Sequence, residues 1–164
     1  MTIGRKTFEQ RLLEALHFSG FRVPRQESAF KRCIEAVERV KSFSGLEVEG
    51  TPFVEVHSGD GDDPVFDRLW VFTPSLAVRL SDPRRPENDW VLDLYRLADV
   101  RHVNLKDVSH PQHSQAEFSV TFNIRGSDMT LSASGDNCNV LREVSALILR
   151  AYVAGIHGAL EAGN

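Results

Sequence analysis

The period of the apolar residues changes near Gly50, and this change constrains the fold of the 164-residue chain more than any other feature. Before Gly50, apolar side chains recur at intervals of three and four residues, which is the spacing of one face of an α-helix. After Gly50 they alternate with polar side chains, which is the spacing of a half-buried β-strand. The sequence therefore predicts an α+β protein with a helical region at 1–50 and a β-rich region at 51–164.

The N-terminal region has the signals of two successive helices. Thr7 and Gln10 have the spacing of a capping box, in which each side chain accepts a hydrogen bond from the other residue's backbone N–H. Gly20 is placed to end the first helix, and Pro24 suits the first turn of a second helix, which Gly45 is placed to end. We therefore expect an N-terminal αα-hairpin.

Seven segments after Gly50 have the alternation and composition of β-strands. The clearest begins at Phe118, after which every second residue is apolar, and Gly126-Ser127 predicts a tight turn behind it. The segment that begins at Val100 has a weaker pattern, which predicts a β-bulge. Short connections between so many strands are typical of a small antiparallel sandwich or barrel. The predicted strands are 52–57, 67–72, 75–81, 90–95, 100–105, 117–125 and 128–134.

The predicted C-terminal helix, which Ser134 or Asp136 could cap, carries two apolar stripes. The core stripe is centred on Val144, Ile148 and Gly155. The second stripe lies well over 100° away around the helix axis, at a 100° turn per residue. It consists of Leu149, Val153, Ile156 and Leu160. A helix that only closes a β-sandwich needs one stripe, so something should cover the second.

Three explanations for the second stripe remain open from the sequence. The N-terminal helices could dock on it within the same chain, a partner or a second copy could bind it, or the helix end could be frayed and partly exposed. Under the second explanation these four residues form a protein-binding surface, and the protein could be a dimer.

The order of seven strands and one amphipathic helix resembles the pleckstrin-homology superfold in its bacterial PH-like and GRAM-like versions. The resemblance rests on "LWVFTPSLAVRL", "WVLDLYRLADVRHVNL", "FSVTFNIRGSDMTLSAS" and "NVLREVSALILRAY", within the range Pro52 to Tyr152. It implies a seven-stranded antiparallel PH-like sandwich or barrel, capped by the C-terminal helix, with the αα-hairpin as an addition. PH-like domains bind phosphoinositides, peptides or other proteins, so the resemblance alone does not decide the function.

The resemblance also implies that the loop at 82–88 lies at the rim where phosphoinositide binders hold their ligand. Arg84 and Arg85 in this loop could contact an anion or a partner. The neighbouring rim loop carries acidic residues, which would weaken the capture of an anion. These residues are Asp60, Asp62 and Asp63. A solvated turn or a protein contact is therefore favoured over binding to anionic lipid, which is kept as the alternative function.

Metal sites are not predicted. Asp60, Asp62 and Asp63 lack the twelve-residue pattern of a calcium-binding loop, which ends in a distant glutamate. His110 and His113 could begin a zinc site, but no further ligands follow at a standard spacing. Cys33 and Cys138 are expected to be reduced thiols of an intracellular protein rather than a disulfide.

Composition and missing motifs narrow the function. A formal net charge of −4 argues against a nucleic-acid partner, which normally selects a basic face. No nucleophile elbow, phosphate loop or metalloprotease motif is present, so neither catalysis nor a cofactor is predicted. The N-terminal segment has no apolar signal core, and no apolar run approaches the ~20 residues of a membrane span. We therefore expect a non-catalytic cytoplasmic protein-interaction module, such as an adaptor, a chaperone or an immunity-type inhibitor.

Overall fold

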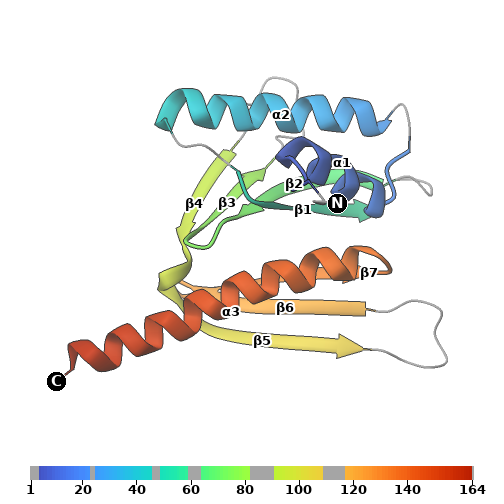
Figure 1. The fold of residues 1–164 in the computed structure, drawn as a ribbon. Coiled ribbons are helices and arrows are strands. Elements are labelled where there is room, and N and C mark those ends of the chain that lie inside the picture. Colours follow the sequence, from blue (N-terminus) through green and yellow to red (C-terminus); the bar gives the residue numbers. More distant parts are fainter. Residues whose placement is uncertain are drawn as a thin grey trace. The chain divides into compact units, whose positions relative to one another are not determined.

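The computed structural model describes residues 4–22, 25–45, 49–58, 64–81, 91–108 and 117–163, which contain three α-helices and seven strands (Figure 1). The strands form two antiparallel sheets, one of four strands in the order β1-β2-β3-β4 and one of three in the order β5-β6-β7. In chain order the elements are α1 (Phe8–Phe18), α2 (Arg25–Ser44), β1 (Thr51–Ser58), β2 (Pro64–Phe72), β3 (Leu76–Ser81), β4 (Val91–Arg96), the 3₁₀ turn η1 (Leu97–Asp99), β5 (Val100–Val108), β6 (Glu117–Ile124), β7 (Ser127–Ser134) and α3 (Asn137–Ala162). The α+β class with seven strands and a C-terminal helix is confirmed.

The chain forms two compact units. The first consists of Met1–Val71 with Arg79–Asp93, and the second of Phe72–Val78 with Leu94–Asn164. The described strands form two separate sheets and do not close into a barrel. The division of the chain into 1–50 and 51–164 stays a prediction.

The boundaries of α1 follow from local hydrogen bonds. The Gln10 N–H donates to Thr7 Oγ1 at 3.2 Å, and the Thr7 N–H donates to Gln10 Oε1 at 2.9 Å, which confirms the predicted capping box. After the helix ends, Gly20 adopts a φ of +93° and the Phe21 N–H donates to the Leu16 carbonyl at 3.1 Å. This is the geometry of a Schellman motif, and it needs a residue that tolerates a positive φ, as the sequence predicts for Gly20.

The core of the first unit is formed by the apolar stripes of its helices and by the strands. Helix α1 packs against β1 and α2. The β2 residues from Leu69 to Val71 are all buried, so both faces of this strand are covered. Cys33 is buried and forms no disulfide. The buried helix residues are Leu12, Ala15, Leu16, Ala29, Cys33, Ala36 and Val40.

The three-stranded sheet of the second unit has the alternation that the sequence predicts. In β6, Phe118 and every second residue after it are buried, whereas the residues between them are half-exposed or exposed. The pairing of β5 with β6 shifts between Val100 and His102, which confirms the predicted bulge. The turn between β6 and β7 consists of Arg125 and Gly126, at φ of +52° and +82°, one residue earlier than predicted. Two positive φ values are typical of a type I′ hairpin turn.

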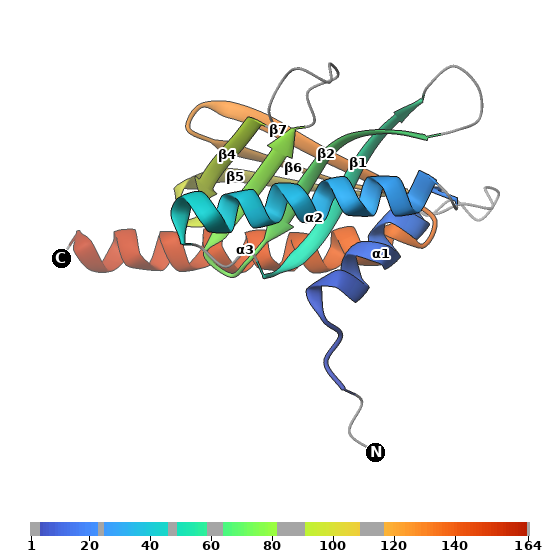
Figure 2. The same ribbon diagram turned by 90° about the horizontal axis from the view of Figure 1, so that it is seen from above.

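Helix α3 packs against all three strands of this sheet and against η1 (Figures 1 and 2). Val144 and Ile148 are fully buried, and a Cβ at Gly155 would lie 3.4 Å from the Ala98 carbonyl oxygen, so the predicted core stripe is confirmed. Asp136 is the residue before the helix, but its side chain makes no capping hydrogen bond. The prediction of a side-chain cap there was wrong because Asp136 has helical φ and ψ values rather than the extended ones that aim a cap at the helix.

Candidate functional site

The second stripe of α3 is the largest apolar feature that the C-terminal half of this helix exposes. Val153, Ile156 and Leu160 retain 47%, 42% and 66% of their surface, and Leu149 is half-buried. On the other side of the helix, Ile148 is 0% exposed. The sheet therefore takes up the core stripe, while the side chains of the second stripe remain accessible to a partner.

The position of the second stripe follows from where α3 leaves the sheet. Figures 1 and 2 show α3 running past the ends of β5, β6 and β7 toward the C-terminus. From Val153 to Ala162 every residue except Gly155 is exposed, and Gly155 is the point of close approach to η1. About three turns of helix, or ~15 Å at 1.5 Å per residue, thus protrude from the second unit.

Helix α3 is also the one helix in the described part of the chain that is long and apolar enough, by length and composition alone, to cross a membrane. Buried core helices pass the same test, and the first half of α3 contributes Leu141, Val144 and Ile148 to the core. Arg142, Glu143 and Arg150 interrupt the apolar surface of the helix. Length and mean hydropathy therefore do not distinguish a membrane-spanning helix from an amphipathic helix of the core.

A charged network crosses the four-stranded sheet of the first unit, and sequence reasoning missed it. Trp70 Nε1 donates to Glu55 Oε2 at 2.6 Å, and Arg68 Nη1 lies 3.7 Å from the same oxygen. Arg79 Nη2 donates to Asp93 Oδ2 at 2.7 Å, and the Arg79 guanidinium carbon lies 5.6 Å from the centre of the Trp70 ring. The four strands thus each contribute a member to one row of paired side chains.

The electrostatics of Glu55 reflect its partial burial in this network. Burial raises the pKa of the Glu55 carboxyl above its ordinary value of 4.5, while the hydrogen bond from Trp70 and the charge of Arg68 oppose that rise. Arg79 lies between Trp70 and Asp93 because of the way the strands pair, so the network is best interpreted as a structural element of the sheet.

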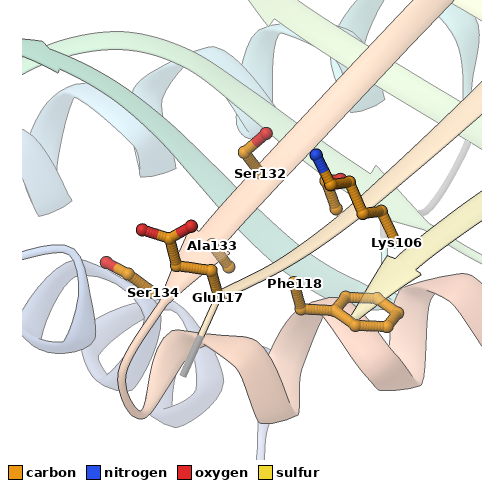
Figure 3. A pocket seen from close by; sticks show the side chains of 7 residues that line it. Lys106, Glu117, Phe118, Ser132, Ala133 and Ser134 are labelled. Carbon is orange, nitrogen blue, oxygen red and sulfur yellow. The ribbon is translucent and has the colours of Figure 1, made fainter. Parts of the chain in front are cut away.

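The three-stranded sheet carries an open hollow of about 430 Å³ that residues of all three strands line (Figure 3). The pairing register places Lys106, Ser119 and Ser132 side by side across β5, β6 and β7. Lys106 and Glu117 are exposed charges, so neither is desolvated as a catalytic acid or base usually is. The hollow is lined by Lys106, Glu117, Phe118, Ser119, Ser132, Ala133 and Ser134.

A second hollow of about 370 Å³ lies beside the start of α1 in the first unit. Basic side chains line it, but Lys6 Nζ donates to Glu14 at 2.6 Å and Arg11 Nη1 donates to Thr51 Oγ1 at 3.4 Å. Glu49 also lines this hollow. The basic groups are therefore partly neutralised by neighbouring acidic and polar groups.

Arginines surround one carboxylate at the start of β5. Arg96 Nη2 lies 3.1 Å from Asp99 Oδ1, and Arg125 Nη2 lies 3.7 Å from Asp99 Oδ2. The hydrogen bond from Arg96 lowers the pKa of Asp99 below its ordinary value, and the charges of Arg125 and Arg101 act in the same direction. Three positive charges thus face one negative charge, which leaves a basic surface at this end of the second unit.

The remaining sites considered from the sequence lie outside the described residues. These are Arg84 and Arg85, the three aspartates Asp60, Asp62 and Asp63, and the pair His110 and His113. Within the described ranges, no group of three or more His, Cys, Asp or Glu side chains could hold a metal ion. Among the predicted site residues, the structure describes those of the second stripe, which lie along one side of α3.

Comparison with known protein families, with curated proteins and with solved structures finds no match. No family assignment follows, and the resemblance to PH-like domains depends on the order of the elements. The function must accordingly be inferred from the geometry of this chain.

Proposed function

We propose that the protein is a non-catalytic cytoplasmic protein-interaction module that binds its partner through the second stripe of α3. The observation that supports this proposal is the exposure of Val153, Ile156 and Leu160 on a helix whose opposite side is anchored in a sheet. Large aliphatic side chains grouped on one exposed surface are characteristic of protein-binding sites. Burying a fully exposed side chain of this size contributes on the order of 1.5–3 kcal/mol. Because Val153, Ile156 and Leu160 are already partly buried, each would contribute a correspondingly smaller share to association.

The proposal includes a PH-like sandwich as the finer description of the fold. Its support is the order of seven strands followed by one amphipathic helix, together with the packing of that helix on a three-stranded sheet. An adaptor, a dedicated chaperone and an immunity-type inhibitor are all consistent with such a module. The charged network that includes Glu55 and Asp93 supports a non-catalytic function, because its charged side chains pair with one another within the sheet.

A matched pair of variants tests this function. The full chain is immobilised and used to capture partners from its native cell, in parallel with Val153→Glu on the stripe and Ala154→Glu beside it. Both positions are exposed, so neither glutamate should disturb folding. We expect a partner that the wild type and Ala154→Glu retain and that Val153→Glu loses, and titration of the purified partner should reproduce this order. Equal binding to both variants, or no specific capture, would contradict the proposal.

A second candidate function is binding to an anionic lipid surface. The loop at 82–88 motivated it from the sequence, and the basic surface around Asp99 adds Arg96, Arg101 and Arg125. Vesicles containing phosphatidylserine should then sediment the protein at low salt. Arg84→Glu with Arg85→Glu, and separately Arg96→Glu with Arg125→Glu, should show which basic surface contributes. Absence of sedimentation at low salt would remove this candidate.

A further inference from the structure

The second stripe has the residue spacing of a coiled-coil seam. Leu149, Val153, Ile156 and Leu160 follow one another at intervals of four, three and four residues. This is the alternation of the a and d positions in a heptad, with Val153 and Leu160 at a and Leu149 and Ile156 at d. A seam of this kind is complementary to another helix with the same spacing.

The protruding part of α3 offers apolar surface to a second helix. Its exposed residues begin at Val153 and continue to the end of the helix, apart from Gly155. These turns extend a helix that the core already nucleates, so a second helix is not needed to form them, but packing beside one would bury their exposed aliphatic side chains.

We propose that the occupant of this seam is a second copy of the chain, with the two α3 helices antiparallel. A two-fold axis between Ala154 and Gly155 then places Leu149 against Leu160 of the second copy, and Val153 against Ile156 of the second copy. Each contact occurs twice by symmetry, so four layers of large aliphatic side chains form without a gap. This inference rests on the proposed function, because it names the partner of the same surface.

The charges beside the seam favour the antiparallel orientation. Arg150 and Glu161 are exposed and lie on the same flank of the seam. In an antiparallel pair these flanks meet, and Arg150 comes within reach of Glu161 of the second copy, twice by symmetry. In a parallel pair, the flank with Arg150 and Glu161 instead meets the opposite flank of the second copy. That opposite flank carries Tyr152 and Ala159 and has no charge.

The antiparallel orientation needs only residues 149–160 of each helix. The residues that precede Leu149 pack on the sheet of their own copy, and in the antiparallel pair they lie beyond Leu160 of the other copy. Each folded body therefore lies at the opposite end of the helix pair. Two helices that meet over twelve residues bury less than the roughly 1,600 Å² of a standard interface, so the dimer is weak and depends on protein concentration.

Sedimentation equilibrium of the full chain over a wide concentration range tests the dimer. We expect reversible dimerisation, weakened about tenfold or more by Val153→Glu and unchanged by Gly158→Glu, since Gly158 is exposed and lies on the side of the helix opposite the seam. Arg150→Glu should weaken the dimer, and adding Glu161→Arg should restore it. A wild-type protein that stays monomeric, or a Gly158→Glu effect as large as that of Val153→Glu, overturns the proposal.

Disulfide trapping tests the orientation. Leu149→Cys protein mixed with Leu160→Cys protein should give mixed disulfides, because an antiparallel pair places these positions opposite each other. Two copies of position 149 would lie about 16 Å apart, beyond the reach of a disulfide. Self-linked Leu149→Cys dimers would overturn the antiparallel arrangement.

Two further outcomes separate this proposal from the functions above. A monomer that still captures a different protein through Val153 overturns the dimer but leaves the proposed function standing. A monomer that captures no protein and sediments with phosphatidylserine vesicles overturns both.

Discussion

Ile148 and Ile156 provide a matched test of how α3 divides its surface between core and partner. Both belong to the same helix, two turns apart, but Ile148 is 0% exposed and Ile156 is 42% exposed. Ile148→Ala should reduce the free energy of unfolding by about 2–5 kcal/mol, because it leaves a cavity under the sheet. Ile156→Ala leaves no enclosed cavity, so its cost should be about 1 kcal/mol or less. The higher helix propensity of alanine offsets part of that cost.

Urea denaturation of the two variants and the wild type measures these costs. Far-ultraviolet circular dichroism follows the helices, and near-ultraviolet dichroism follows side-chain packing, at protein concentrations low enough to leave the chain monomeric. Similar losses for Ile148→Ala and Ile156→Ala in the monomer would refute the reasoning. They would mean that the chain itself covers the second stripe, which would then be no partner surface.

Three further predictions follow from individual contacts. Burial raises the folded-state pKa of Glu55 above 4.5, so the free energy of unfolding should fall as pH rises from 4.5 through the raised pKa. Glu55→Gln should flatten this part of a plot of the urea midpoint against pH. Gly126 has a φ of +82°, so Gly126→Ala should cost about 1 kcal/mol in chemical denaturation while Gly126→Asn costs less, and equal costs would contradict the turn assignment. Gly155→Leu should lower the melting temperature, because the added Cβ would lie 3.4 Å from the Ala98 carbonyl oxygen and would leave little room for the rest of the leucine side chain. Gly158→Leu, with open space around it, should not lower the melting temperature, and a similar loss in both would argue against the close approach at Gly155.

The elements of this protein could be predicted because their signals are local. The Thr7 capping box, the alternation that begins at Phe118 and the bulge after Val100 each depend on residues a few positions apart. The core stripe of α3 was also predictable, since the helical period alone places Val144 and Ile148 on one side. Backbone sterics and solvent exclusion act over this short range in any fold that contains these segments.

Other features depend on which segments meet, and only the tertiary structure decided them. Leu92 and Leu94 alternate as core residues do, yet both are exposed in β4, because burial of a sheet face depends on what packs against it. The row from Glu55 to Asp93 exists because four strands align residues 38 positions apart in sequence. The sequence contained both stripes of α3 and predicted which one faces the core, but it left open whether anything in the chain covers the second stripe. The exposure of Val153, Ile156 and Leu160 depends on the point where the helix leaves the three-stranded sheet, and contacts between distant parts of the chain set that point.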